Sequence, residues 1–417
     1  MKQSILFYSD CPFFAGCENM LANFFNNQEF RDSYEILFIY RWSTQYEKGF
    51  KIRVPNQIEN ISVCLYDRNE LSISIDSIPS AVLRKPLKFL VNTGLVKYFL
   101  ITLNTLILFR ILRKKKVDLL HVNNGGYPAA YSTISMVFAA RLHGIKRIVY
   151  VVNNIAVGYV TRDRRLDYIF DWIVVRWVTM FVTGSLFAGS ALKKTLKIPS
   201  NKILCIPNGI APRKVTETRE EVMQRLHLPQ NRRIFSVIAN LEDRKGHIYL
   251  LKSLKQLKNF YPGLLIPYCI IEGTGPTEKS LKTFVGENDL INDVLFISHE
   301  EQIFNLISAS DCIILPSVKD EDFPNIILES MSLGKAIIAS NFSGIPEQIE
   351  NMKSGLLVEP GDVTSLATAI NFMLEHPEMI DIFGENAKDR FEELFKDKTA
   401  INHYTEIYNK LIEENPS

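Results

Sequence analysis

Two glutamates enclose a short apolar run in the stretch EDFPNIILES, residues 321 to 330. Glu321 and Glu329 stand on either side of it. Apolar runs of this kind cover a core, where a carboxylate is costly unless a polar partner meets it. The pattern therefore predicts that both acids face a polar ligand, although an acid near a helix start can also serve only to stabilise the helix dipole.

Two adjacent cations form a second group that could do chemistry. Arg244 and Lys245 stand directly before Gly246 and an expected helix, in the stretch ANLEDRKGH at 239 to 247. Free N–H groups and the dipole at a helix start both favour anions, and neighbouring cations add to that preference. A phosphate group is the ligand that this arrangement predicts.

A glycine loop, IEGTGP at 271 to 276, follows another apolar run and again precedes an expected helix. Its glycines, Gly273 and Gly275, are expected to let a ligand approach the backbone closely. In parallel α/β sheets, ligands bind in the crevice outside the carboxyl ends of the strands. One such loop is often only a turn, but two in succession favour that crevice.

The elements that must position these groups alternate between short apolar runs and helical stretches, which is typical of parallel sheets. In the first half we expect strands at 5–8, 36–40, 61–66, 117–122, 147–152 and 203–206, and helices at 16–27, 98–115, 128–142 and 166–178. In the second half we expect strands at 233–239, 265–271, 293–297, 311–315, 335–339 and 355–358. Two doubly wound α/β domains follow, with a boundary between Asn208 and Arg232.

Composition is that of a globular protein, because 417 residues with 47% hydrophobic and 23% charged side chains fit neither a disordered chain nor a polytopic membrane protein. The apolar stretch at 98–109 has about half of the roughly 20 residues needed to cross a bilayer. The start, MKQSILFYSD, has too short an apolar run for a signal peptide, so we expect a cytoplasmic protein.

Charge is divided unevenly along the chain. Residues 1 to 208 carry 27 basic and 14 acidic side chains, whereas residues 209 to 417 carry 21 and 32. Basic clusters occur at Arg110 to Lys116 and at Arg162 to Arg165, the latter followed by Trp172 and Trp177. These features predict that the first half lies peripherally on an anionic membrane, while solvated surface charge without a role remains the alternative.

No metal site is expected. The six cysteines, Cys11, Cys17, Cys64, Cys205, Cys269 and Cys312, show no paired spacing and are interpreted as reduced thiols of the core. The seven histidines show no ligand spacing with cysteine or aspartate.

Several motifs in fixed order resemble the retaining glycosyltransferases of family 4. ANLEDRKG, GTGP, EDFPNIILE, SGIPE and SGLLVEPGD follow one another over about 125 residues, as the family's donor-binding motifs do. The first half is similar more loosely, through PFFAGCENML, DLLHV and the hinge sequence IPNGI. The resemblance implies a GT-B fold, in which two Rossmann-like domains face each other across a cleft.

The resemblance also implies a domain plan and a reaction. It implies an acceptor-binding, membrane-facing domain at 1–212, a nucleotide-sugar-binding domain at 213–395, and a C-terminal helix at 396–417 that returns to the first domain. The expected reaction transfers a hexose-type sugar from a nucleoside-diphosphate sugar to a glycan, lipid-linked in our interpretation, with retention of configuration. Such enzymes need neither cofactor nor metal, so the match of residues 320 to 322 to a metal-binding Asp-x-Asp signature is discounted. No nucleic acid partner is expected.

Family roles transfer to individual residues by their position in these motifs. Glu321 is expected to hold hydroxyls of the transferred sugar and Glu329 those of the ribose, while Lys245 and Arg244 stabilise the departing diphosphate. The further donor-binding residues implied are Gly16, Asn240, Glu272, Gly273, Gly275, His299, Phe323, Pro324, Asn325 and Ile326.

Three departures from the family pattern leave other functions open. Asn240 stands at the family arginine, Cys17 at a family glycine, and VVNN at 151–154 where a histidine is expected. We expect Arg244 to supply the missing charge and His121 to be a substitute catalytic residue, although a lone histidine at a strand end is more often structural. A nucleotide-sugar-binding protein with a decayed catalytic site and a nucleotide-sugar 2-epimerase of the same fold are the alternatives.

Overall fold

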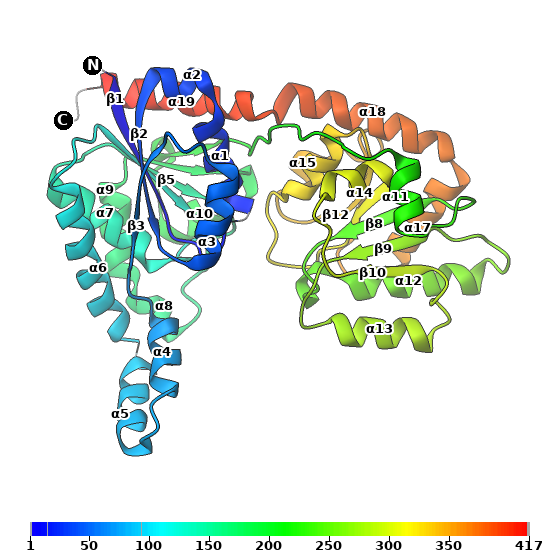
Figure 1. Ribbon diagram of the computed structural model, residues 1–417, viewed down its shortest axis with the longest axis horizontal. Coiled ribbons are helices and arrows are strands. Elements are labelled where there is room, and N and C mark those ends of the chain that lie inside the picture. Colours follow the sequence, from blue (N-terminus) through cyan, green and yellow to red (C-terminus); the bar gives the residue numbers. More distant parts are fainter. Residues whose placement is uncertain (1, 15, 93, 415–417) are drawn as a thin grey trace. The chain divides into compact units, whose positions relative to one another are not determined.

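The computed structural model describes residues 2–14, 16–92 and 94–414, which form two compact units. The first unit holds the chain up to Ile206 together with the segment from Ala400 onward, and the second is Pro207–Thr399. The division falls a few residues before the boundary expected between Asn208 and Arg232. Each unit is a parallel sheet with helices on both faces, which confirms the predicted α/β fold class (Figure 1).

The first unit contains a seven-stranded parallel sheet in the order β3-β2-β1-β4-β5-β6-β7. Its strands are β1 Gln3–Ser9, β2 Tyr34–Arg41, β3 Glu59–Val63, β4 Leu119–Asn124, β5 Ile148–Val152, β6 Met180–Thr183 and β7 Ile203–Cys205. Its helices are α1 Gly16–Asn26, α2 Gln28–Ser33, α3 Thr44–Arg53, α4 Arg68–Asp76, α5 Ala81–Asn92, α6 Val96–Leu112, α7 Tyr131–His143, α8 Arg162–Leu166, α9 Tyr168–Trp177 and α10 Leu186–Leu196, with the 3-10 turn η1 Ser200–Lys202.

The last helix, α19 (Asp397–Glu413), completes the core of the first unit. Tyr404 and Tyr408 are buried there against the ring of Phe24 on α1. Tyr34 at the start of β2 donates a hydrogen bond to the side-chain carbonyl of Asn409 (2.6 Å). One face of the first sheet is therefore covered by residues from both ends of the sequence.

The second unit contains a six-stranded parallel sheet in the order β10-β9-β8-β11-β12-β13. Its strands are β8 Ile234–Ile238, β9 Tyr268–Glu272, β10 Val294–Ile297, β11 Cys312–Leu315, β12 Ala336–Ser340 and β13 Leu356–Val358. Its helices are α11 Arg219–Arg225, α12 His247–Phe260, α13 Glu278–Glu287, α14 Ile303–Ala309, α15 Asn325–Ser332, α16 Ile345–Gln348, α17 Val363–Glu375 and α18 Pro377–Leu394, with the 3-10 turn η2 Asp243–Lys245.

Strand order reverses once in each sheet, between β1 and β4 in the first unit and between β8 and β11 in the second. At such a switch point the following segments leave toward opposite faces and open a crevice at the carboxyl ends of the strands. The segments that follow β8 and β11 carry Lys245 and Glu321. The topology of the second unit thus supplies the crevice that the motifs predict.

The helical pair α4 and α5 was not anticipated from the sequence. The two helices lie side by side and extend beyond the rest of their unit (Figure 1). Val82 and Phe89 of α5 are exposed at 83% and 73%. Among the described residues, no helix is both long enough and apolar enough to cross a membrane.

Candidate functional site

The two loops at the switch point of the second unit bring Lys245 and Glu321 together. Lys245 Nζ contacts Glu321 Oε2, and the hydroxyl of Ser317 donates to the same oxygen at 3.1 Å. The side chains of Lys245 and Glu321 are only 13% and 12% exposed. A cation and a carboxylate are therefore held in contact, with little access to water.

Backbone packing between these loops explains the glycine after Lys245. Gly246 has φ +73°, and a Cβ atom there would lie 1.9 Å from the carbonyl oxygen of Pro316. The N–H of Val318 donates to the carbonyl of Arg244 at 2.8 Å. Only glycine allows this approach, so Gly246 fixes the distance between the cation loop and the acid loop.

The glycine loop after β9 lies in close contact with the loop after β8. A Cβ atom at Gly273 would lie 2.2 Å from the carbonyl oxygen of Ala239, and one at Gly275 would lie 2.3 Å from that of Leu241. These glycines let the β9 loop pack against the β8 loop. The expectation that a ligand approaches this loop closely stays a prediction.

Arg244 is held by one hydrogen bond within its own loop and one to the loop after β11. Its Nε donates to Glu242 Oε2 at 2.5 Å and its Nη1 to the carbonyl of Asp320 at 3.1 Å. Asn240, which stands at the family arginine, is exposed. Arg244 is thus neither directed freely into solvent nor paired with Glu321, and its expected role at the diphosphate stays a prediction.

The acid motif surrounds the start of α15. Pro324 occupies the N-cap position, immediately before the first helical residue. Phe323 is buried and packs edge-on against Phe395, while Asn325, Ile326 and Glu329 are half-buried. Phe323 therefore anchors the segment that presents Glu321.

Glu272 and His299 come from the ends of β9 and β10. Glu272 is buried and accepts a hydrogen bond from the N–H of Glu300 at 3.2 Å, and burial raises the pKa of its carboxyl group. His299 is exposed beside it. The predicted donor residues of the second unit thus lie at the carboxyl ends of four strands, β8, β9, β10 and β11.

His247, the first residue of α12, was missed from the sequence. Its ring is 2% exposed, and within the described part of the chain neither ring nitrogen has a hydrogen-bond partner. Burial, together with the nearby charge of Lys245, lowers the pKa of His247 to about 4. The order Lys-Gly-His at a helix start was the available signal, because it places an imidazole directly behind the cation.

The aspartates of the Asp-x-Asp match do not form a pair. Asp320 is exposed with φ +54°, whereas Asp322 is buried and accepts a hydrogen bond from the hydroxyl of Ser343 at 3.3 Å. Of the described residues, only Cys11, Cys17 and Glu18 offer three potential ligand atoms within 4.8 Å of one another. The geometry gives the Asp-x-Asp match no support as a metal site.

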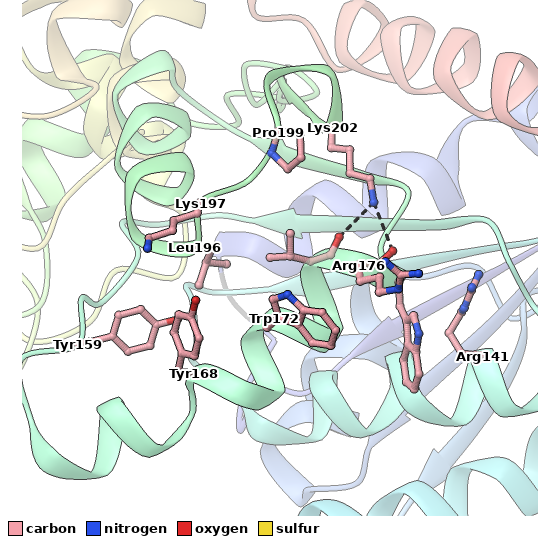
Figure 2. A pocket seen from close by; sticks show the side chains of 11 residues that line it. Arg141, Tyr159, Tyr168, Trp172, Arg176, Leu196, Lys197, Pro199 and Lys202 are labelled. Atoms are coloured by element: carbon pink, nitrogen blue, oxygen red, sulfur yellow. Dashed lines mark hydrogen bonds between the residues drawn. The ribbon is translucent and has the colours of Figure 1, made fainter.

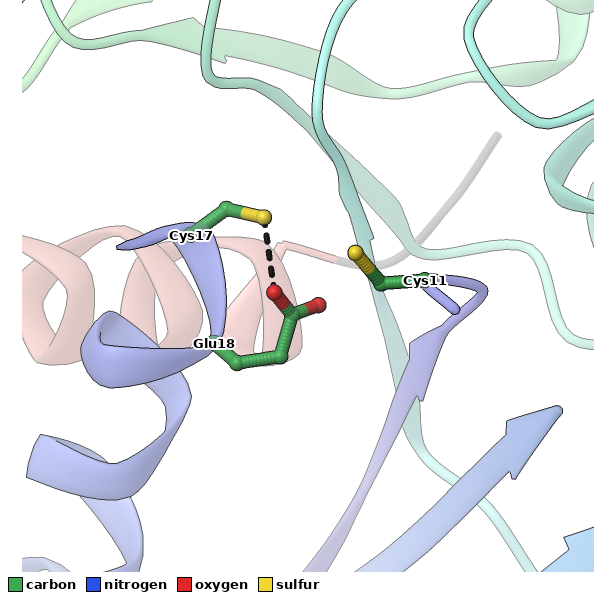
Figure 3. A group of neighbouring side chains, drawn as sticks. All are labelled: Cys11, Cys17 and Glu18. Atoms are coloured by element: carbon green, nitrogen blue, oxygen red, sulfur yellow. Dashed lines mark hydrogen bonds between the residues drawn. The ribbon is translucent and has the colours of Figure 1, made fainter. Parts of the chain in front are cut away.

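Cys11, Cys17 and Glu18 gather between the end of β1 and the start of α1, next to Gly16 (Figure 3). Glu18 is buried, and it accepts hydrogen bonds from Ser9 at 2.6 Å and from the Cys17 thiol at 2.8 Å. Burial raises the pKa of Glu18, while hydrogen bonding with Cys11, followed by burial, raises that of Cys17. Two thiols and a carboxylate suit a soft cation, but the raised pKa values and the hydrogen bonds also satisfy the group without one.

The interpretation of the cysteines as core thiols is correct for two of the six. Cys269 and Cys312 are buried, whereas Cys64 is exposed and the other three are half-buried. Cys11 and Cys17 nevertheless lie close together, because the chain turns back between them.

His121 is not suited to the catalytic role that was expected. It is 2% exposed on β4, and its Nδ1 lies 2.5 Å from the hydroxyl of Tyr408. The rings of Phe7 and Phe24 pack against it, and burial lowers its pKa to about 3. The prediction is wrong because α19 covers this strand with aromatic side chains, so His121 is a neutral core residue.

The cluster Arg162, Arg164 and Arg165 is also only partly a surface feature. Arg164 is 4% exposed and its Nη1 donates to Asp171 Oδ2 at 2.6 Å. Arg162 and Arg165 are exposed. The charge of Arg164 is therefore neutralised by a buried ion pair, and only Arg162 and Arg165 present their charges at the surface.

Comparison with family descriptions gives two matches that follow each other along the chain. Residues 218–390 match the description "Glycosyl transferases group 1", and residues 68–214 match "Glycosyltransferase Family 4". The two matches together cover both units.

Curated relatives are similar over part of the chain. The amylovoran biosynthesis glycosyltransferase AmsK of Erwinia amylovora is 30% identical over 220 residues, 51% of this chain and 52% of that protein. The N-acetyl-alpha-D-glucosaminyl L-malate synthase of Bacillus anthracis is 29% identical over 145 residues, 35% of this chain and 38% of that protein. The chain thus spans about half the length, or less, of these curated relatives.

Solved structures are similar over nearly the whole chain. A glycosyltransferase of Rickettsia africae has a TM-score of 0.77 at 20% identity, covering 99% of this chain and all of its own. HepE of Anabaena, solved in complex with UDP, has a TM-score of 0.75 at 18% identity, covering 98% of this chain and 100% of its own. At these identities the likeness shows the fold, which is that of the GT-B proteins.

Proposed function

The chain belongs to the group 1 glycosyltransferases with the GT-B fold, and on that premise we propose that it transfers a hexose-type sugar from a nucleoside-diphosphate sugar to a glycan acceptor with retention of configuration. The observation that carries the proposal is the contact between Lys245 and Glu321 at the switch point. HepE of Anabaena has also been solved with UDP-glucose, which supports a nucleotide sugar as the donor.

Lys245 and the start of α12 stabilise the leaving diphosphate in this proposal. The bond between the anomeric carbon and the β-phosphate oxygen breaks, and negative charge grows on the phosphate. Lys245 exchanges its contact with Glu321 for that phosphate, while the N-terminal dipole of α12 points at the same charge. Because the cation is already held and largely shielded from water, little reorganisation is needed when the charge develops.

Glu321 and Glu329 orient the donor. Glu321, released from Lys245, accepts hydrogen bonds from sugar hydroxyls, and Glu329 accepts them from the ribose. The acceptor oxygen attacks the anomeric carbon from the face that the phosphate leaves, and its proton passes to the leaving phosphate oxygen. The reaction then needs neither a protein nucleophile nor a metal ion, so dialysis against a chelator is expected to leave the transfer rate unchanged.

The acceptor is proposed to be lipid-linked and the protein to be peripheral on the cytoplasmic face of the membrane. This part of the proposal is supported by the excess of basic residues in the first half of the sequence and by the exposed residues of the cluster at Arg110 to Lys116. Within that cluster Lys115 is paired with Glu59, which reduces its free charge. Binding to anionic vesicles that falls with added salt would support this part.

The test of the transfer reaction is donor consumption by the purified protein. A thermal-shift screen over nucleotide sugars identifies the donor first, because a ligand at about a hundred times its dissociation constant adds roughly 2.7 kcal/mol of stability. The expected result is release of nucleoside diphosphate that depends on a glycan acceptor and is lost in Lys245→Ala. Conversion of the donor to an isomeric sugar without acceptor would favour a 2-epimerase, and binding without turnover would favour a decayed site.

A further inference from the structure

A groove runs along α9 in the first unit (Figure 2). Its volume is about 710 Å³. It extends from Tyr168, the first residue of the helix, to Trp177, the last, and its other side is formed by the end of α10 and the segment before β7. The lining residues are Arg141, Tyr159, Tyr168, Trp172, Val175, Arg176, Trp177, Leu196, Lys197, Pro199 and Lys202.

The charge of the groove is wholly positive. Four of its lining residues, Arg141, Arg176, Lys197 and Lys202, are cations, and none of the described residues that line it is acidic. Lys202 Nζ is fixed by the carbonyls of Val175 and Val178, at 3.1 and 3.0 Å. Burial and the repulsion from Arg141 and Arg176 lower the pKa of Lys202. An anion in the groove would relieve that repulsion.

Nearby carboxylates do not neutralise the positive charge of the groove, because they form ion pairs inside the protein. Asp171, on the buried side of α9, accepts from Arg164 at 2.6 Å and from the hydroxyl of Tyr159 at 2.7 Å. Asp167 is 1% exposed and pairs with Lys97 at 2.7 Å. Each carboxylate thus has its own buried cation, and the groove keeps its excess of positive charge.

Exposed apolar side chains lie on α9 and just before it. Ile169 and Trp172 on α9 are 67% and 58% exposed, and Leu166 just before them is 46% exposed. Figure 2 shows Trp172 between the two tyrosines and Arg176. Aromatic and aliphatic groups beside cations are typical of surfaces that enter the headgroup region of a bilayer, where rings and cationic heads lie at the polar boundary.

We propose that the α9 groove binds the phosphate group of an anionic lipid, with Trp172 and Ile169 entering the headgroup region beside it. The groove's cations match a phosphate and its apolar rim matches the start of the acyl chains, so a lipid satisfies both sets of side chains. The α9 groove would then be the site of the proposed membrane association, and this proposal rests on that association. It does not depend on the transfer chemistry of the second unit.

Tryptophan fluorescence can report the groove directly. The chain has three tryptophans, and two of them, Trp172 and Trp177, line the groove. In a Trp42→Phe protein, titration with phosphatidylglycerol vesicles is expected to shift the emission to shorter wavelength, because Trp172 leaves water. Phosphatidylcholine vesicles are expected to produce no shift. Inorganic phosphate and glycerol phosphate are added as soluble competitors. They are expected to weaken vesicle binding only at high concentration.

Removing two exposed cations tests the groove without disturbing its support. In Arg176→Gln/Lys197→Asn, asparagine tolerates the left-handed backbone that Lys197 adopts (φ +55°), and Lys202 keeps its hydrogen bonds. Binding to phosphatidylglycerol vesicles is expected to weaken about 30-fold, from about 1 kcal/mol for each cation near an anionic surface. The matched control is Lys51→Gln/Lys410→Gln, since both of these side chains are 73% exposed in the same unit.

Three results would overturn the inference. Vesicle binding unchanged in the groove variant but lost in Val82→Asp/Phe89→Asp would move the membrane contact to α5, leaving membrane association itself intact. A fluorescence response to inorganic phosphate without any response to vesicles would make the ligand a free anion. Equal binding to phosphatidylcholine, or no binding of the wild-type protein to either vesicle, would remove the lipid site, while donor turnover would still decide the transfer reaction separately.

Discussion

The switch-point loops of the second unit and the α9 groove of the first unit both present cations, but they hold them differently. In the loops, Lys245 contacts Glu321 and Arg244 contacts Glu242. In the groove, four cations line one space, and no acid is found among its described lining residues. A paired cation is oriented before the ligand arrives, and the ligand must replace a carboxylate. An unpaired set attracts any anion that fits. The first arrangement suits a reaction and the second suits adhesion to a charged surface.

The largest expected effect comes from breaking the paired arrangement at Lys245. Lys245→Ala is expected to lower turnover about 10²- to 10³-fold, the usual scale for losing one preorganised group that stabilises transition-state charge. Single-turnover transfer rates measure it. Lys252→Ala is the control, because Lys252 is an exposed lysine of α12. A wild-type rate in Lys245→Ala would falsify the assignment of the second unit as the donor domain.

The two glutamates of the acid motif, Glu329 and Glu321, are expected to differ in their effect on donor affinity. Glu329→Ala is expected to weaken donor binding by roughly 1.5 to 3 kcal/mol, the scale of a hydrogen bond to a charged group. Glu321→Ala is expected to lower turnover more than affinity, since Glu321 also holds Lys245. Calorimetric titration with the donor separates the two variants. Equal losses of affinity in both would contradict the division of roles.

The two units can also be compared in the pH dependence of their stability, because each contains a buried histidine with a lowered pKa. The pKa of His121 is about 3 in the folded protein, below the ordinary value of 6.5, so the unfolded chain takes up the proton first. His121 therefore destabilises the fold as the pH falls from 6.5 toward 3, by up to about 1.4 kcal/mol per pH unit. His247, with a pKa of about 4, acts with the same sign in the second unit.

Urea unfolding followed by tryptophan fluorescence reports the first unit, because Trp42, Trp172 and Trp177 all lie in it. His121→Asn keeps a hydrogen-bond acceptor near Tyr408 and removes the titrating ring. Its unfolding free energy is expected to fall less steeply between pH 6.5 and 4 than that of the wild type. His247→Asn is the control, and its slope by this probe is expected to match the wild type. Equal slopes in the wild type and His121→Asn would show that His121 titrates normally.

The smallest effect is expected for Arg244. Its ion pair with Glu242 is partly exposed, with side chains 28% and 37% accessible, and such pairs contribute about 0 to 1 kcal/mol. Arg244→Ala is expected to lower turnover less than Lys245→Ala does, because Glu242 and the carbonyl of Asp320 already hold its guanidinium group. A loss as large as that of Lys245→Ala would instead support Arg244 as the replacement for the arginine missing at Asn240, and Asn240→Arg should then restore part of the rate.

The sequence predicted the second unit well because its signals are local. Glycines, cations and acids stand a few residues from the strands that carry them, so the order of the motifs already placed Lys245 and Glu321 at one edge of the sheet. The contact between the two was not predicted, because it depends on backbone packing between Gly246 and Pro316. For the same reason the packing of Gly273 and Gly275 against the β8 loop was not predicted.

His121 and Arg164 of the first unit were misassigned because their contacting residues are distant in the sequence or buried. His121 was taken for a catalytic residue because Tyr408, which covers it, is 287 residues away in the sequence. Arg164 was counted as surface charge, although the spacing of Arg164, Asp167 and Asp171 puts all three on one helical face and could have indicated an internal ion network. The α9 groove was only partly anticipated, since Trp172 and Trp177 were noted but not Lys197 or Lys202.

The return of α19 has a consequence for how the protein is made. Tyr34 and Asn409 are bonded across 375 residues, and Tyr404 and Tyr408 complete the aromatic core around Phe24. A ribosome finishes residues 207–399 before it reaches those tyrosines, which at 5–20 residues per second takes roughly 10–40 s. During that interval the first unit lacks α19, and the phenylalanine rings that Tyr404 and Tyr408 cover stay exposed. The first unit, although it begins the chain, can therefore complete its core only when almost the whole chain has been made.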